Sequence, residues 1–160
     1  IKKESFLFTL SLILADFGVT DWDLLRYYDG RSTYQTSFNS NPPQKFVNTG
    51  EKSKPRSPVL AKATRDLIYN VNLTWVRRVR GLATPLGYGP VALDEDSELY
   101  EIDVYNGSNV VRTISATSQT ATYTAAQQTE DGLVPGNEIH VKIYQISATR
   151  GRGYPGEFTL

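Results

Sequence analysis

The sequence predicts an all-β protein, a sandwich of about seven strands preceded by a smaller β-rich segment. From Pro58 onward, short apolar runs alternate with polar residues at a period of two, and turn-forming residues separate the runs. Val, Ile, Thr and Tyr dominate this half, and no window of it carries the apolar spacing of an amphipathic helix. Such alternation means that one face of each sheet packs on a second sheet while the other meets water.

Seven segments of residues 58–160 are predicted to be strands. In chain order they are "SPVLAKAT", "NVNLTWV", "ELYEIDVY", "VVRTISA", "TATYTAA", "EIHVKIYQIS" and "GEFTL". Asn106-Gly107 after the third predicts a type I′ hairpin, because this dipeptide tolerates positive φ at both central positions. Seven strands in about a hundred residues are typical of an immunoglobulin-like sandwich. Its predicted core comprises Trp75, Tyr100, Ile102, Val104, Ile139, Val141 and Ile143.

The chain changes character near residue 40, which predicts three parts. Residues 1–40 are a β-rich segment of an upstream domain, residues 41–57 are a linker, and residues 58–160 are the sandwich. Four prolines between Asn39 and Pro58 favour the linker, because proline lacks a backbone donor and fixes φ. The apolar run Phe6–Ala15 is too short to span a bilayer. Its alternation favours a buried strand over the remnant of a signal peptide.

Composition excludes several classes of function. Seventeen basic and seventeen acidic residues leave no net charge, so the chain lacks the basic footprint of a nucleic-acid-binding protein. Cysteine is absent, which excludes disulfides, thiolate catalysis and thiolate metal sites. We expect no nucleic-acid partner and no cofactor.

No group of residues indicates catalysis, and we predict that the chain is not an enzyme. The single histidine, His140, alternates outward without a recognisable nucleophile or orienting partner. The acidic run Asp94–Glu98 could offer oxygen ligands to calcium, but its spacing favours a solvated loop. Asp21, Asp23 and Asp29 could form a carboxylate pair for sugar cleavage, although sequence spacing does not fix their geometry.

Two groups of residues are candidates for binding at the surface. Two basic clusters could contact phosphates, carboxylates or a neighbouring subunit, and subunit contact or a solvated strand end is the favoured interpretation. Clustered aromatics could stack on sugar rings or anchor an interface, or they could cover the junction between the first segment and the sandwich. The basic residues are Arg77, Arg78, Arg80, Arg150 and Arg152, and the aromatics are Trp22, Tyr27 and Tyr28.

Three motifs resemble a fibronectin type III domain in order and spacing. They are "LTWV", "LYEIDVYNG" and "GLVPGNEIHVKIYQISATRGRGYPG". The resemblance implies that Trp75 lies in the core and that Leu133, Pro135 and Gly136 form the turn before the sixth strand. Leu133 and Pro135 are also expected among the structural core residues. The family's corner tyrosine is replaced here by Ile139. The resemblance therefore implies that the tyrosine's hydrogen bond across the corner is missing.

A second resemblance, over residues 46–160, is to the carboxy-terminal region of the tail-tip, or host-specificity, proteins of tailed phages and gene transfer agents. It is strongest around "YTAAQQ" and "GRGYPGEFTL". It implies a structural component of a tail tip or baseplate hub in a virion, involved in tail assembly and in host-surface recognition. It also implies other tail-tip proteins and copies of the chain itself, such as a trimer, as partners, with a host glycan or protein as a further partner and no stable membrane insertion.

Two other functions stay open. One is a fibronectin-like spacer or carbohydrate-binding module of a secreted or cell-surface protein. The other is a hydrolase acting on cell wall or capsule through carboxylates in residues 16–31. A catalytic domain in the parent chain, or sugar binding that depends on Trp22, Tyr27 or Tyr28, would favour the first of these.

Overall fold

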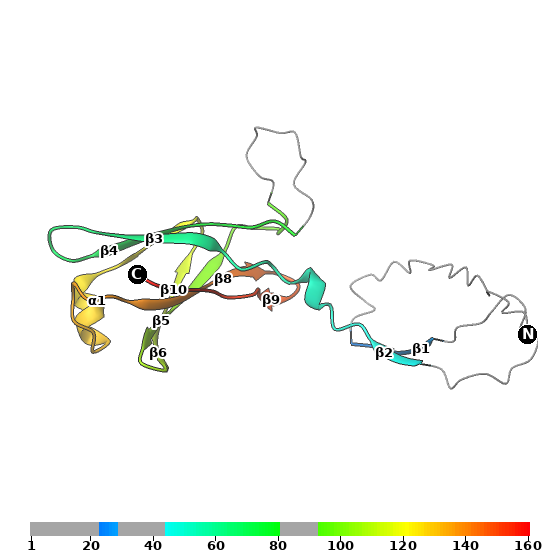
Figure 1. Ribbon diagram of the computed structural model, residues 1–160. Helices are drawn as coiled ribbons and strands as arrows, with labels where there is room; N and C mark the ends of the chain where they lie inside the picture. The colour runs from blue at the N-terminus through cyan, green and yellow to red at the C-terminus, as the bar shows by residue number, and fades with distance from the viewer. Residues whose placement is uncertain (1–22, 29–43, 81–92) are drawn as a thin grey trace, which may run out of the picture. The chain divides into compact units, whose positions relative to one another are not determined.

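The computed structural model describes residues 23–28, 44–80 and 93–160 (Figure 1). The predicted strand or signal remnant of residues 1–15 lies outside the described residues, as do Asp21 and Asp29. The chain divides into two compact units, Ile1–Lys52 and Ser53–Leu160.

In the first unit, the described residues form a two-stranded antiparallel sheet of β1 (Leu25–Tyr28) and β2 (Gln44–Val47). The backbone N–H of Asp23 extends the pairing by donating to the carbonyl of Asn48 at 2.8 Å. Strand β2 and a 3₁₀ turn at Glu51–Ser53 both fall inside the predicted linker of residues 41–57. The prolines that favoured a linker remove donors only at their own positions, so the segment after Pro43 is free to pair.

The second unit is a sandwich of two antiparallel sheets (Figure 1). One sheet has the order β3-β4-β7, from β3 (Val59–Arg65), β4 (Val71–Val76) and β7 (Thr120–Tyr123). The other has the order β10-β8-β5-β6, from β10 (Gly156–Thr159), β8 (His140–Ser147), β5 (Tyr100–Asn106) and β6 (Asn109–Ala116). The short β9 (Gly151–Arg152) pairs with β8. All seven predicted strands form, and the all-β, immunoglobulin-like sandwich is confirmed.

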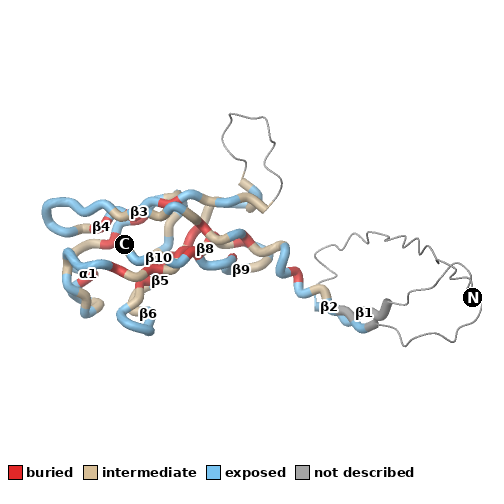
Figure 2. Tube along the Cα trace, in the orientation of Figure 1, coloured by how far each residue is buried: buried red, intermediate tan, exposed pale blue. Residues whose placement is uncertain are grey.

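The core lies between the two sheets and follows the alternation of the sequence (Figure 2). Every second residue of β4 and of β8 is buried, as the period of two requires. Trp75 is 4% exposed and meets Tyr100 edge to face, with ring centroids 5.1 Å apart. Leu133 packs against this core while partly exposed, and Pro135 is only half-buried. The buried apolar residues are Val71, Leu73, Trp75, Tyr100, Ile102, Val104, Ala121, Tyr123, Ile139, Val141 and Ile143.

The predicted strand "TATYTAA" is wrong in its second half. Strand β7 ends at Tyr123, and helix α1 (Ala125–Glu130) follows it. Thr124 and Gln127 form a capping box, in which each side chain accepts a hydrogen bond from the other residue's backbone N–H, at 3.2 Å and 2.9 Å. The apolar spacing in this stretch carries no signal for this short helix.

The hairpin between β5 and β6 forms where predicted, but its turn differs from the predicted type. Asn106 pairs with Asn109, so Gly107 and Ser108 are the central residues. Gly107 has φ +63°, whereas Ser108 is not among the residues of positive φ. This is the φ pattern of a type II′ turn, which needs glycine only at the first central position.

Candidate functional site

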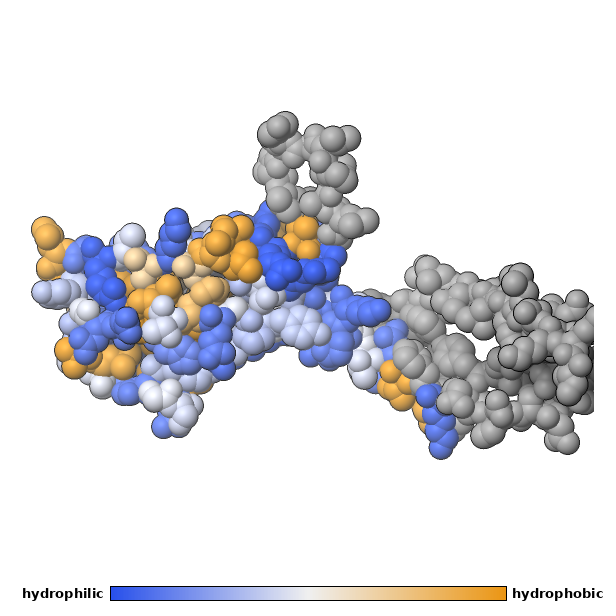
Figure 3. All heavy atoms as spheres, in the orientation of Figure 1, coloured by the Kyte–Doolittle hydropathy of each residue, from blue (hydrophilic) through white to orange (hydrophobic). Residues whose placement is uncertain are grey.

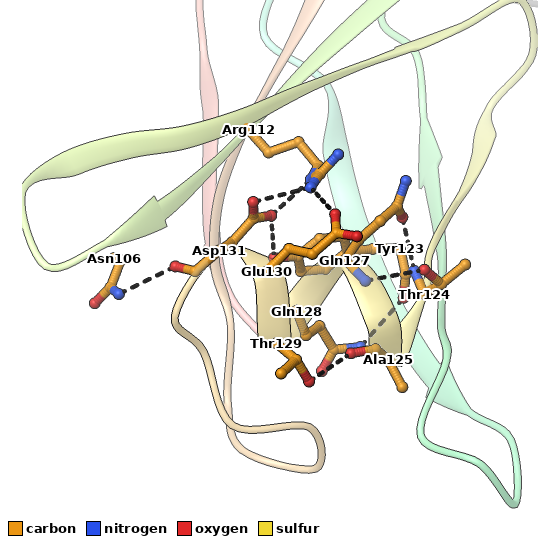
Figure 4. Close-up of polar contacts among 10 residues, drawn as sticks. All are labelled: Asn106, Arg112, Tyr123, Thr124, Ala125, Gln127, Gln128, Thr129, Glu130 and Asp131. Carbon is orange, nitrogen blue, oxygen red and sulfur yellow. Dashed lines mark hydrogen bonds and ion pairs between the residues drawn. The ribbon is translucent and has the colours of Figure 1, made fainter.

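The polar cluster at the corner between β7 and β8 centres on Asp131 (Figure 4). Arg112 donates from Nε to Oδ2 of Asp131 at 2.6 Å and from Nη2 to Oδ1 at 2.9 Å. The same Nη2 reaches Glu130 at 3.1 Å. The hydroxyl of Tyr123 donates to Oδ2 of Asp131 at 2.7 Å. One carboxylate therefore connects β6, β7 and the end of α1.

Local structure explains why these side chains meet. Arg112 lies opposite Val104 in the register of β5 and β6, so it is on the inner face of its strand. Asp131 is the C-cap of α1, and its side chain is 7% exposed. The hydrogen bond from Arg112 lowers the pKa of Asp131 and outweighs the effect of burial. Burial and the bond to Asp131 raise the pKa of Tyr123.

The hydrogen bond between Tyr123 and Asp131 lies at this corner but differs from the tyrosine bond whose absence the sequence implies. Ile139 occupies the position of the family's corner tyrosine and is buried. Tyr123 comes instead from the strand before the corner and bonds to Asp131 within it. Asn106 adds weak bonds from its side-chain amide to the carbonyls of Asp131 and Gly132, at 3.4 Å and 3.3 Å.

A second polar network lies on the outer face of the larger sheet and centres on Arg152. Its guanidinium contacts Asp103 at 2.6 Å and 3.0 Å and Glu101 at 2.6 Å, and it stacks over the ring of Tyr144 at 4.6 Å. Thr113 donates at 2.6 Å to Oδ1 of Asp103, which also accepts from Nη2 of Arg152. The bonds to Asp103 raise the pKa of Arg152. These contacts satisfy the carboxylate of Asp103, which is only 3% exposed. Removing Arg152 would therefore leave a buried charge without its partner.

The single histidine belongs to a third group on the same face. His140 Nε2 lies 2.9 Å from Glu157, and Lys142 lies 3.3 Å from the same carboxylate. Tyr105 completes the group, 5.0 Å from the imidazole and 5.2 Å from the ammonium. Hydrogen bonds from His140, which has the larger effect, and from Lys142 lower the pKa of Glu157. The group joins β10 to β8, and in it His140 has a carboxylate partner but no nucleophile.

The basic cluster of Arg77, Arg78 and Arg80 lies against the acidic run Asp94–Glu98. Arg80 forms an ion pair with Glu95 at 2.7 Å, and its backbone N–H donates to Asp94 at 2.6 Å. It also donates to the carbonyl of Ser53, at the start of the second unit. Arg77 lies 3.4 Å from Glu98. The acidic run therefore neutralises part of the basic cluster within the same chain.

The remaining predicted site residues are Arg78, Arg150, Trp22, Tyr27 and Tyr28. Arg78 is exposed two residues after the end of β4, and Arg150 lies just before β9. Trp22 lies outside the described residues. For Tyr27 and Tyr28 only the backbone, in β1, is described.

The arrangement offers structural connections rather than an open reactive group. A carboxylate whose lone pairs are occupied by two or more donors, as in Asp131 and Asp103, is poorly placed to accept a proton from a substrate. Among residues 23–28, 44–80 and 93–160, no three His, Cys, Asp or Glu side chains are grouped to hold a metal ion. Nor does any helix within those ranges have the length and apolar character to cross a membrane.

Sequence reasoning missed these networks because their members are far apart along the chain. Arg152 is 49 residues from Asp103, and Arg112 is 19 residues from Asp131. One local signal was present, the Thr-x-x-Gln pattern at Thr124–Gln127, which predicts a helix start and hence a tight corner. The arginine pairings have no comparable signal, since they depend on strand register.

Comparisons with known proteins find solved structures that match this chain at low sequence identity. No protein-family model matches this chain, and a search of curated proteins finds no match. Domains d3–d4 of the extracellular region of rat CD45 match with a TM-score of 0.48 and 12% identity, over 100% of this chain and 76% of that one. The FN5 domain of Drosophila Lar matches with a TM-score of 0.37 and 13% identity, over 66% of this chain and 94% of that one. Both are fibronectin type III structures.

Proposed function

We propose that this chain is a non-enzymatic structural module of a phage-like tail tip, in which the sandwich holds neighbouring parts at a fixed separation. One observation carries the structural role. The segment through which the chain enters the sandwich is hydrogen-bonded to, and closely packed against, the segment that leads into the last strand. The tail-tip setting comes from the sequence resemblance. Other tail-tip proteins and further copies of this chain are the proposed partners, with a host glycan or protein as a further one.

The entering segment, Ser53–Pro58, lies directly against the segment that leads into β10. The N–H of Tyr154 donates to the carbonyl of Pro55 at 2.9 Å. Gly153 and Gly156 are needed for this approach, because a Cβ at Gly153 would lie 2.6 Å from the Pro55 oxygen and one at Gly156 would lie 2.3 Å from the Pro58 oxygen. These glycines belong to "GRGYPGEFTL", one of the stretches in which the tail-tip resemblance is strongest.

The chain enters the sandwich at one end of β3, and Leu160 lies near the other end of that strand (Figure 1). The entering segment reaches Pro58 just before β3 begins. At the other end Arg65 closes β3, and its guanidinium lies 3.4 Å from the carbonyl of Leu160. Seven extended residues separate these ends by about 20 Å. A rigid module with separated ends suits a spacer between other parts of an assembly.

The test is the position of the protein in particles. Antibody raised against residues 56–160, labelled with gold and imaged on intact particles from the source, should mark the distal tail tip. Unlabelled particles, with the protein found in culture medium or cell extract, would contradict the tail-tip setting. Adsorption assays with tip-labelled particles would then test whether the module contacts the host surface.

The fibronectin-like fold equally favours a second candidate, a spacer or carbohydrate-binding module of a secreted or cell-surface protein. A pure spacer should bind no glycan. A carbohydrate-binding module should bind one and lose it when Trp22, Tyr27 or Tyr28 becomes Ala. The same measurement on Tyr154→Ala, an aromatic in the second unit, is the matched control.

A further inference from the structure

The turn between β3 and β4 carries three consecutive large side chains that the fold leaves in solvent. Leu67 is 100% exposed, Ile68 is 67% exposed and Tyr69 is 55% exposed. Figure 3 shows hydrophobic atoms at the end of the molecule where this turn lies. We call Leu67, Ile68 and Tyr69 the apolar tip. A short turn does not require apolar residues, so their presence at its most exposed point calls for a partner.

The backbone of the apolar tip is held by its own neighbours. Oδ1 of Asp66 accepts hydrogen bonds from the N–H groups of Ile68 and Asn70, at 3.0 Å and 2.9 Å. Oδ2 of Asp66 accepts from the side-chain amide of Asn70 at 2.8 Å, and the carbonyl of Asp66 accepts from the N–H of Tyr69 at 3.1 Å. One aspartate thus satisfies three successive backbone donors of the turn.

The turn is also fastened to helix α1. Oδ1 of Asn70 accepts from the N–H of Ala125 at 2.9 Å. Gln128, fully buried, donates from Nε2 to the carbonyl of Tyr69 at 2.9 Å. Tyr69 has φ +64°, a conformation that these bonds support. The apolar tip is therefore presented in one conformation before any partner arrives.

We propose that the apolar tip enters the interfacial region of a lipid bilayer as a shallow, reversible contact. All three side chains are more than half exposed, so a fluid that surrounds the tip matches it better than a pocket open on one side. Backbone groups that enter an apolar medium must already be hydrogen-bonded, and Asp66 and Gln128 supply such bonds here. Tyrosine favours the interface between water and hydrocarbon, and no charged residue interrupts the three.

The contact lies outside the proposed structural role and does not depend on it. Val134 adds apolar surface nearby, because it is 64% exposed in the same loop as Gly136, whose added Cβ would lie 3.3 Å from the Tyr69 ring. Arg65 and Asp66 lie at the base of the turn and limit the depth of entry to the three tip residues.

The first experiment uses the absence of cysteine, which makes any introduced cysteine a unique site for labelling. The full chain carrying Ile68→Cys is labelled with an environment-sensitive fluorophore and mixed with phosphatidylcholine vesicles. Emission should shift to shorter wavelength and be quenched by brominated lipid. The control is Thr120→Cys, an exposed position on β7, where neither change is expected. No vesicle-dependent change at Ile68→Cys, or equal changes at both positions, would overturn the proposal.

The second experiment measures binding directly by vesicle flotation. Leu67→Ser combined with Ile68→Ser should lower the partition of the full chain into phosphatidylcholine vesicles by about tenfold or more. The circular dichroism melt should be unchanged, because neither side chain contributes to the core. Unchanged partition overturns the proposal. Self-association in sedimentation that the serine variant abolishes, without any vesicle binding, would overturn it in favour of a contact between copies.

Discussion

At the scale of single residues, Asp131 shows how one side chain can hold a corner of the fold. It accepts hydrogen bonds from both Arg112 and Tyr123. The hydroxyl of Tyr123 is thus bonded to a charged acceptor in a buried setting. Tyr123→Phe should lower the free energy of unfolding by about 1.5–3 kcal/mol, the range for bonds to charged groups. Chemical denaturation followed by circular dichroism measures the change.

Tyr69→Phe is the matched control for this substitution. Tyr69 is 55% exposed in the β3–β4 turn, so losing its hydroxyl should change stability by less than about 0.5 kcal/mol. Equal effects of the two substitutions would mean that the bond between Tyr123 and Asp131 contributes nothing.

Trp75 is the second residue with a large predicted effect. Its ring is 4% exposed and packs edge to face on Tyr100. Trp75→Ala removes most of a buried aromatic side chain and leaves a cavity, so it should cost about 3–5 kcal/mol in urea denaturation. A loss below about 1 kcal/mol would contradict the burial of this strand. Trp75→Phe should cost less, because it preserves much of the apolar contact.

At the scale of elements, helix α1 has only six residues and depends on its cap. Thr124→Ala removes the side-chain oxygen that accepts from Gln127 and should lower the free energy of unfolding by about 1 kcal/mol. Thr124→Ser retains that oxygen and should be close to the original protein. Similar losses of stability for Ala and Ser would indicate that the methyl group of Thr124, and not its hydrogen bond, stabilises the helix.

The elements divide by how far sequence could predict them. The strands were predictable because each carries its own signal, as in β4, where Val71, Leu73 and Trp75 alternate with polar residues. Helix α1 was missed because its six residues follow a strand-like run, and only the capping pattern at Thr124 marks the change. The pairing of Arg152 with Asp103 could not be predicted from the sequence. It depends on the register of β9 against β8 and on that of β8 against β5.

At the scale of the whole molecule, many of the charges in the sandwich are used in pairs within it. Arg112, Arg152 and Lys142 each contact a carboxylate from a different element. A chain of zero net charge can therefore carry strong local interactions that composition does not reveal. The consequence is a dependence of stability on pH.

Stability should fall in acid because two of these carboxylates have lowered pKa values. Arg112 lowers the pKa of Asp131, and His140 with Lys142 lowers that of Glu157. Near and just below the ordinary carboxyl pKa of about 4, the unfolded chain therefore binds more protons than the folded one. The stabilisation is present above that pH and is lost as pH falls through the lowered values. Urea denaturation at a series of pH values from 7 to 2 measures the slope.

The double variant Asp131→Asn with Glu157→Gln separates these two groups from the other carboxylates. It should be less stable than the original protein at pH 7, because Arg112 and Lys142 lose charged partners. Its stability should fall less steeply below pH 5, since neither replacement binds a proton in that range. The decisive quantity is the difference between the two slopes. Parallel curves for the two proteins would mean that acid acts through other carboxylates.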